Sequence, residues 1–320
     1  MKKLLVAFLA GFIGFSSYGQ TPIQTIFPDD IAQGKKLIEA YFTPMAESFG
    51  AGLNNGWYNT AKPHSLGGFD VTFTLNTVII PNTAETFKIG DEFGNVFQSN
   101  KDEAATVFGN DGVTAMYYDP SSLVGTDSIP FNMPGGFKTP AMPLPMIQAG
   151  IGLIKNTAID IRYMPMLKVG DFNVNLFGIG LKHDLLQWIP GIGDAIPMSL
   201  SLQGGYTSIN TELTVPDQNQ KVSLNTKATT INLVASKKIL MLTGYAGVGY
   251  NSATTTFAAD ANFNLDGIQF DETVEIDFKS IKKLRTNIGL RLNIAVVTIQ
   301  ADYTFSEYPT ATLGLGVSLR

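Results

Sequence analysis

The chain has 320 residues, a formal net charge of −5 and no cysteine. The mildly acidic balance disfavours nucleic acid as a partner, and the lack of thiols excludes disulfides and cysteine-ligated metal sites. Only 15% of the residues are charged, whereas ordinary water-soluble domains carry about 25%. This deficit predicts a surface that partly faces lipid.

Residues 1–19 have the pattern of a secretory signal peptide. Lys2 and Lys3 form a basic start, an uncharged apolar run covers residues 4–15, and small residues precede a cleavage site predicted after Gly19. The run is shorter than the about 20 apolar residues that a membrane-spanning helix needs, and no later stretch approaches that length. We therefore expect an exported protein without transmembrane helices.

Residues 20–66 predict short helices rather than strands. Asp29 and Asp30 can cap one helix that runs to Ala40, whereas Thr43-Pro44 has the pattern of an N-cap followed by proline at the first helical position. Gly50-Ala51-Gly52 and Asn54-Asn55-Gly56 predict the helix end. We expect a pre-barrel segment that lies in the periplasm or plugs the barrel mouth, and a loosely ordered arm is the alternative.

Residues 67–320 predict an all-β fold, a transmembrane antiparallel β-barrel. Apolar and polar residues alternate strictly in many stretches, most clearly in 287–320, so each strand has one apolar and one polar side. Besides strands near 69–75 and 84–99, the candidates are 146–154, 157–166, 171–183, 197–208, 221–235, 239–257, 272–280, 284–295, 297–305 and 310–320. Barrels of this kind have even strand numbers, so we expect about 12–14 strands.

Residues 100–144 are the least strand-like part of this region. Turn signals and crowded prolines mark the segment, and proline cannot donate a hydrogen bond to a sheet. We expect a long ordered loop that lies over the mouth or inside the lumen.

Seven charged residues lie opposite apolar rows and are predicted to line the lumen. A charge that faces lipid near the bilayer centre costs about 2–4 kcal/mol for Arg or Lys, so these side chains should point inward. They either fix the barrel shape through cross-lumen contacts or contact a solute. The candidates are Asp160, Arg162, Glu275, Asp277, Lys279, Arg291 and Asp302.

The sequence offers little for catalysis, metals or cofactors. The two histidines, His64 and His183, are isolated, and His183-Asp184 sits at a strand end, where adjacent side chains point apart. The acidic residues of 260–272 match no calcium-loop spacing, and the glycines of 244–249 lack the strand–turn–helix context of a nucleotide loop. We expect no catalytic residue, no metal, no cofactor and no enzymatic activity.

Two segments resemble a family of uncharacterised Gram-negative outer-membrane barrels. They are Gly56-Trp57-Tyr58-Asn59-Thr60-Ala61-Lys62, followed by the strand from Gly67, and the closing stretch from Tyr303 to Arg320. The layout as a whole is distantly similar to the FadL-type long-chain fatty acid channels, although no binding residue can be transferred. The chain ends in Leu319-Arg320 rather than in the aromatic residue that the barrel-assembly machinery usually reads.

The resemblance and the strand pattern together predict a protein of the cell outer membrane. We expect a channel or transporter for small hydrophobic solutes, with 20–66 or 100–144 occluding the lumen. The alternatives are a structural or adhesive barrel with a closed lumen, or a passive porin. Expected partners are outer-membrane lipids, a hydrophobic small molecule and the barrel-assembly machinery, but not nucleic acid. The solute and the oligomeric state stay open.

Overall fold

The computed structural model describes residues 31–90, 93, 96–119, 128–169, 172–189, 197–215, 220–265 and 268–319. The predicted signal peptide and the helix start predicted at Asp29 lie outside these residues. The chain divides into two compact units, one formed by Met1–Ala46 with Ile80–Ala141 and the other by Glu47–Ile79 with Met142–Arg320.

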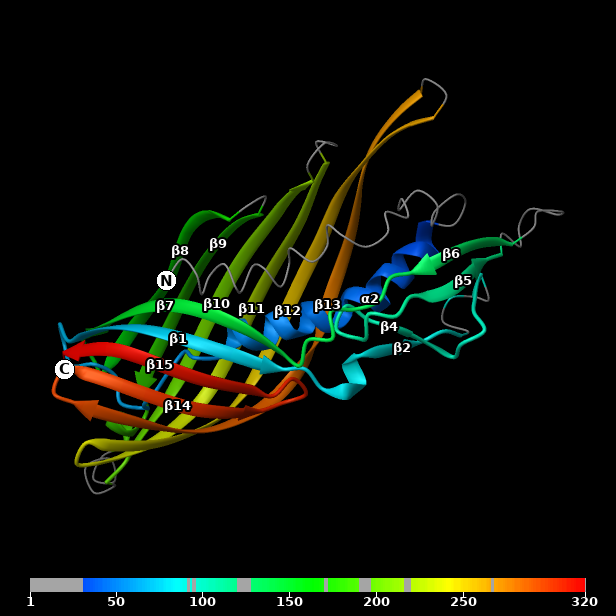
Figure 1. Cartoon of the computed structure of the whole chain (residues 1–320). Helices are drawn as coiled ribbons and strands as arrows, with labels where there is room; N and C mark the ends of the chain where they lie inside the picture. The colour runs from blue at the N-terminus through cyan, green and yellow to red at the C-terminus, as the bar shows by residue number, and fades with distance from the viewer. Residues whose placement is uncertain are drawn as a thin grey trace. The chain divides into compact units, whose positions relative to one another are not determined.

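The second unit is built on a closed antiparallel barrel whose described residues form ten strands (Figure 1). Around the barrel the order is β1, β15, β14, β13, β12, β11, β10, β9, β8 and β7. The strands are β1 (Phe69–Ile79), β7 (Ala141–Leu153), β8 (Thr157–Val169), β9 (Phe172–Asp184), β10 (Ser199–Val215), β11 (Gln220–Ile239), β12 (Leu242–Leu265), β13 (Ile268–Ile294), β14 (Val297–Phe305) and β15 (Thr310–Leu319). The predicted fold class is confirmed.

The predicted number of 12–14 strands is wrong for two reasons. The candidate at 84–99 lies in the other unit, and the candidates 272–280 and 284–295 are a single strand, β13. The pairing of β13 with β12 shifts between Asn251 and Ala253, which face Lys283 and Ser280 respectively. This β-bulge places an additional residue in β13 and reverses its alternation, so one long strand has the sequence pattern of two.

The inner and outer faces of the barrel strands alternate as the pattern predicts. On β1 the side chains of Val71 and Phe73 are exposed, whereas those of Thr72 and Thr74 are buried. The outer face is thus apolar and the interior polar over this part of the wall, the reverse of a water-soluble barrel. Among the described residues, no helix is both long and apolar enough to span a bilayer.

The first unit contains two small sheets. Its elements are η3 (Asn82–Ala84), β2 (Thr86–Lys88), β3 (Phe97–Gln98), β4 (Glu103–Ala105), β5 (Thr114–Tyr118) and β6 (Ile129–Met133). Strands β2 and β4 pair, as do β3, β5 and β6, around a buried aromatic cluster that includes Phe93, Phe97, Tyr118 and Phe131. The prediction of 100–144 as a loop is corrected here, because short strands with their own core occupy part of it and β7 begins at Ala141.

Helix α2 (Ile31–Asn54) is one continuous helix rather than the two that Thr43-Pro44 predicted. Pro44 lies inside it, and the Thr43 hydroxyl donates to the carbonyl of Glu39 at 2.7 Å. The helix runs through Gly50-Ala51-Gly52, which was predicted to end it, and ends at Asn54, the start of the second predicted end signal. Gly56 then takes a φ of +73°, a backbone conformation that favours glycine.

Candidate functional site

The segment 47–66 lies inside the barrel of the second unit. After α2 ends, the Tyr58 hydroxyl donates to Asn287 on β13 at 2.7 Å. Further along, the amide of Ala61 donates to the Ser236 hydroxyl on β11 at 2.9 Å, and the amide of Gly67 reaches the carbonyl of Gly152 at 3.1 Å. The segment therefore follows the lumen along its length before it turns into β1, and we call residues 47–66 the plug.

The barrel wall caps the C-terminal end of α2. The last carbonyls of a helix lack partners within the helix and carry partial negative charge. Arg162 on β8 donates to the carbonyls of Leu53 at 2.8 Å and Asn55 at 2.7 Å, and Arg285 on β13 donates to the carbonyl of Asn54 at 2.8 Å. Both guanidinium groups are buried, where unpaired N–H donors are costly. The carbonyls at the helix end therefore supply acceptors that these arginines need.

Asn76 on β1 completes this cap and links it to a third part of the wall. Its amide donates to the carbonyls of Gly52 at 2.9 Å and Asn55 at 3.1 Å. The Thr304 hydroxyl on β14 donates to the side-chain oxygen of Asn55 at 2.7 Å. Because side chains from four strands hold one helix end, the plug is fixed to the wall on several sides.

Trp57 fills a slot in the wall, and its ring carries a stacked cation. The Arg162 guanidinium carbon lies 3.6 Å from the ring centre, a cation–π contact inside the barrel. Gly180 on β9 and Gly205 on β10 face the other part of the ring, and a Cβ atom there would lie 2.7 Å and 2.5 Å from it. Gln148 on β7 accepts from Arg162 Nε at 3.0 Å and donates to the Trp57 carbonyl at 3.3 Å, which joins the plug to the wall once more.

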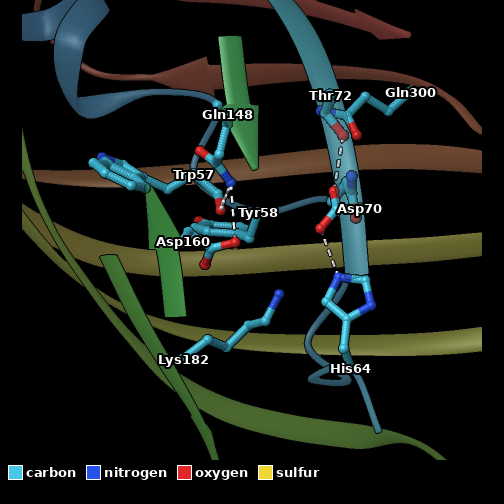
Figure 2. Close-up of a pocket in the computed structure, with 11 residues that line it drawn as sticks. Trp57, Tyr58, His64, Asp70, Thr72, Gln148, Asp160, Lys182 and Gln300 are labelled. Carbon is cyan, nitrogen blue, oxygen red and sulfur yellow. Dashed lines mark hydrogen bonds and ion pairs between the residues drawn. The ribbon is translucent and has the colours of Figure 1, made fainter. Parts of the chain in front are cut away.

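Beside the plug lies a small polar cavity (Figure 2). It is lined by Gly56, Trp57, Tyr58, Asn59, His64, Asp70, Thr72, Gln148, Asp160, Lys182 and Gln300. The volume open to a water-sized sphere is about 10 Å³, room for about one water molecule. The cavity is therefore too small for a solute.

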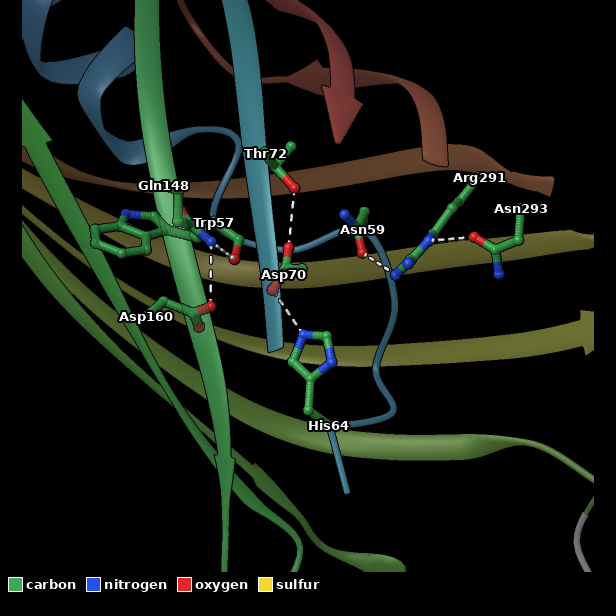
Figure 3. Close-up of polar contacts among 9 residues, drawn as sticks. All are labelled: Trp57, Asn59, His64, Asp70, Thr72, Gln148, Asp160, Arg291 and Asn293. Atoms are coloured by element: carbon green, nitrogen blue, oxygen red, sulfur yellow. Dashed lines mark hydrogen bonds and ion pairs between the residues drawn. The ribbon is translucent and has the colours of Figure 1, made fainter. Parts of the chain in front are cut away.

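His64 and Asp70 form the shortest polar contact at this cavity (Figure 3). His64 Nε2 lies 2.6 Å from Asp70 Oδ1, and the Thr72 hydroxyl donates to Asp70 Oδ2 at 2.9 Å. His64 Nδ1 and Asp160 Oδ2 are buried without a hydrogen-bond partner in the protein, so each is able to bond to water in this cavity. The lining includes a histidine and two carboxylates but no serine or cysteine nucleophile, and the described residues hold no cluster of three metal-ligating side chains.

Four of the seven predicted lumen-lining residues are buried on the inner face: Asp160, Arg162, Arg291 and Asp302. Arg291 donates to Asn59 of the plug at 2.6 Å and to Asn293 at 2.7 Å (Figure 3). Asp302 accepts from the Tyr245 hydroxyl at 2.9 Å, and Asp160 accepts from Gln148 at 3.3 Å. These side chains reach the plug or neighbouring strands.

Glu275 and Asp277 do not line the lumen, which corrects the prediction for both. They are exposed, whereas Ile276 and Phe278 between and after them are buried. The bulge in β13 is the physical reason, because one additional residue turns the following side chains to the opposite face. The side chain of Lys279 lies outside the described part of the structure.

The wall reverses its polarity in the half that carries Asp277. On the outer face, Asn225 donates to Asn210, Asn210 donates to Asn175 and the Thr256 hydroxyl donates to Asp277, which forms a polar belt from β9 to β13. On the inner face beside the belt, the apolar side chains of Leu176, Ile209, Leu224 and Ile276 are buried together with the hydrogen-bonded pair of Thr226 and Thr255. Outward-facing apolar rows therefore cover only the other half of these strands.

The seam between β7 and β8 is paired over only part of its length. The two strands pair from Gln148 opposite Arg162 to Leu153 opposite Thr157, and the described residues 141–147 and 163–168 do not continue the ladder. If the register continued, Pro145 would face Pro165, and neither can donate a hydrogen bond. β8 also shifts its register against β9 between Met164 and Leu167. Proline on both edges thus keeps the seam open.

Sequence reasoning missed Trp57, Arg285 and Asn76 as parts of the site. The glycines at 178, 180, 204 and 205 were a usable signal, because glycine inside a strand often marks a close approach. No pattern in the sequence pairs these glycines with one particular tryptophan.

Solved structures similar to this chain are outer-membrane β-barrels. The translocator domain of the autotransporter NalP from Neisseria meningitidis is 11% identical, with 92% of this chain and 99% of that chain covered and a TM-score of 0.30. Ail, the attachment invasion locus protein of Yersinia pestis, is 10% identical over 79% and 98%, with a TM-score of 0.26. The toluene transporter TbuX of Ralstonia pickettii is 8% identical over 85% and 94%, with a TM-score of 0.27. TM-scores this low carry no functional information.

The similarity to FadL-type channels stays a prediction. No curated protein matches the sequence. One family model matches residues 1–319, almost the whole chain. The chain belongs to this family, the family of unknown function DUF6588.

Proposed function

We propose that the protein is an outer-membrane barrel that passes small hydrophobic molecules between the bilayer and its interior through the β7–β8 seam. The single observation that carries this proposal is the ladder that stops at Gln148 and Arg162, with proline on both facing edges. Backbone groups left unpaired in lipid are costly, so barrel walls are normally fully paired. A gap kept open by sequence therefore suggests a use.

Two observations support the location in the outer membrane: the apolar outer face of the barrel and the sequence pattern at the N-terminus. Exposed apolar side chains such as Ile179, Leu290 and Leu315 cover the outer face of strands whose inner faces are polar. The N-terminal pattern of a signal peptide adds a route of export. Antiparallel barrels with this arrangement of faces are the form in which strands cross a bilayer.

The surroundings of the seam suit an apolar solute. On the inner side Met142, Leu144 and Met146 of β7 are buried, and on the outer side Tyr163 and Met166 of β8 are exposed. Methionine is flexible and polarizable and adapts to apolar surfaces of different shape. The seam also lies next to the polar belt, since β8 pairs with β9 at Tyr163–Phe177, close to Asn175. A solute dissolved in the bilayer beside the seam would therefore meet apolar side chains where the two strands part.

The plug favours gated passage over a passive porin. Trp57, Tyr58 and the arginine-capped helix end occupy the polar part of the lumen. Ions would meet a filled, hydrogen-bonded interior, whereas an apolar molecule at the seam meets methionine and leucine side chains.

A structural or adhesive barrel with a permanently closed lumen is the second candidate. The observation that favours it is the dense packing of the plug, with a cavity of only about 10 Å³ beside Trp57. In that case the seam would not conduct, and closing it would leave uptake unchanged.

The test is to close the seam and to measure uptake. A variant with Pro143, Pro145 and Pro165 each replaced by threonine restores the missing donors, and we expect the ladder to extend. The entry of the fluorescent hydrophobe N-phenyl-1-naphthylamine into protein-containing liposomes should slow severalfold. The matched control replaces three outward residues on fully paired strands by threonine, Ile299, Leu313 and Leu315.

Closure itself needs an independent readout. Because the natural chain has no cysteine, Ile147→Cys with Tyr163→Cys can report it through disulfide formation in the closed variant but not in the parent. A closed seam with an unchanged rate of uptake would refute the transport proposal and favour the structural barrel.

A further inference from the structure

The plug gives the chain a direction through the barrel. At one mouth Glu47 accepts an ion pair from Lys283 at 3.3 Å, and Lys283 also contacts Glu307 in the turn between β14 and β15. The amide of Ile79, where β1 ends, donates to the carbonyl of Pro309 in the same turn at 2.7 Å. Glu47 and the end of β1 therefore lie at the same mouth.

Tyr308 in this turn strengthens the contact with the plug. Its side chain hydrogen-bonds with Glu47, and burial first, then the neighbouring carboxylate, raise the pKa of the phenol above its ordinary value. The start of the plug is thus held at the rim by a tyrosine and a lysine.

The plug ends at the opposite mouth. There the amide of Gly67 donates to the carbonyl of Gly152, near the end of β7. The same mouth holds the start of β1, the end of β15 and the tight turns at 240–241 and 295–296, which join Ile239 to Leu242 and Ile294 to Val297. Between Glu47 and Gly67 the chain therefore runs from one mouth of the barrel to the other.

Two independent features assign the mouths to sides of the membrane. Outer-membrane barrels have short turns on the periplasmic side and longer connections outside. Two-residue turns occur at both mouths, since Ile239 pairs with Leu242 at the mouth of Gly67 and Val169 pairs with Phe172 at the mouth of Glu47. The longest connection, residues 80–140 between β1 and β7, leaves from the mouth of Glu47. At the mouth of Glu47, strands β10 to β13 extend to 17, 20, 24 and 27 residues. Asp277 belongs to the polar belt of Asn175, Asn210 and Asn225, and beyond this belt the exposed residues Glu212, Lys221 and Glu275 are charged, which suits a wall that stands in water.

We infer that the polypeptide crosses the outer membrane through its own barrel, so that the chain between the predicted cleavage site and Glu47 and the connection 80–140 are displayed on the cell surface. The chain enters the second unit at Glu47 and leaves it after Ile79. Both residues lie at the same mouth, so the segments that precede Glu47 and follow Ile79 begin on the same side of the membrane. The displayed residues are accessible to molecules outside the cell, whereas the C-terminal strand end is periplasmic. This inference does not depend on the solute or on the seam.

Cysteine labelling on intact cells tests the inference, because the natural chain has no thiol. Lys36→Cys and Lys101→Cys report the displayed segments, and both positions are exposed. Leu240→Cys and Ala295→Cys report the tight turns at the other mouth. We expect a membrane-impermeant maleimide to label the first pair on intact cells and the second pair only after the outer membrane is permeabilised.

The outcomes separate cleanly. Labelling of position 240 or 295 on intact cells, with 36 and 101 protected until permeabilisation, would reverse the orientation and overturn the inference. Equal labelling of all four positions on intact cells, or of none, would overturn it as well. Full reaction of every variant after denaturation confirms that each thiol is present and reactive, and heat-modifiable migration on gels confirms that each barrel has folded.

Discussion

At the scale of single residues, the ring of one tryptophan of the plug packs against two glycines of the barrel wall, and this contact holds the plug in place. Trp57 is 1% exposed, and its ring lies where side chains on Gly180 and Gly205 would have to be. The barrel interior is packed as tightly as any core, so an added methyl group cannot be absorbed without movement. The two glycines therefore leave room for the Trp57 ring at this place in the wall, and this fixes the position of the plug.

We predict that Gly205→Ala destabilises the folded barrel by about 1–3 kcal/mol, the usual cost of overpacking. The added Cβ would lie 2.5 Å from the Trp57 ring. Denaturant unfolding in detergent micelles, followed by heat-modifiable migration, measures the change. The neighbouring Gly204→Ala is a matched control, because its Cβ would meet no atom within 4 Å.

A second substitution separates the slot from the strand itself. In the Trp57→Ala background, Gly205→Ala should cost much less stability than it costs in the natural chain, because the ring against which the added Cβ would clash is gone. Equal losses in the two backgrounds would mean that the glycine is needed for the backbone of β10 rather than for the tryptophan.

At the scale of elements, the bulge in β13 lets one strand serve two surroundings. Between Ile294 and Arg285 the buried inward side chains are polar, such as Arg291, Asn287 and Arg285, and after the bulge they are Ile276 and Phe278. A strand without the additional residue would place Glu275 and Asp277 in the buried interior, where unpaired charges are costly.

We predict that deletion of Lys282 abolishes or severely lowers assembly. The deletion removes the register shift between Asn251 and Ala253 and turns Glu275 and Asp277 inward. The yield of heat-modifiable barrel after refolding measures assembly. Lys282→Ala, which keeps the chain length, serves as the control and should assemble normally; normal assembly of the deletion would show that the bulge does not set the faces.

At the scale of the whole molecule, the two tryptophans report two different surroundings. Trp57 is buried within the barrel, whereas Trp188, in η5 (Leu186–Trp188), is 62% exposed and donates to His183 at 2.9 Å. An exposed tryptophan with a paired N–H group near a strand end is typical of the membrane interface. His183 accepts the hydrogen bond that pairs this tryptophan N–H group.

We predict that brominated lipids quench the two tryptophans differently. In liposomes, the variant Trp57→Phe, which retains only Trp188, should be quenched by bromine near the headgroups. The variant Trp188→Phe, which retains only Trp57, should resist both brominated lipid and aqueous iodide. Strong iodide quenching of Trp57 would show that water fills the lumen and that the plug is not in place.

The sequence by itself determined the fold class, because strict alternation gives each strand one apolar and one polar side. The export pattern, the low charge and the nearly continuous strands then favour a barrel whose apolar side faces lipid. It also narrowed the end of α2 to residues 50–56 and gave the inward direction of residues such as Arg162 and Arg291. It could not fix the strand number, because a bulge in β13 and a break between strands produce the same change of alternation.

Only the tertiary structure decided what occupies the lumen and how. Trp57 meets Gly180 and Gly205, and Arg162 meets the end of α2, across more than a hundred residues of sequence, and each pairing depends on shape rather than on a local pattern. The open seam was decided in the same way. Pro145 and Pro165 are visible in the sequence, but only the tertiary structure shows that the ladder between β7 and β8 ends at Gln148 and Arg162, just before these prolines would meet.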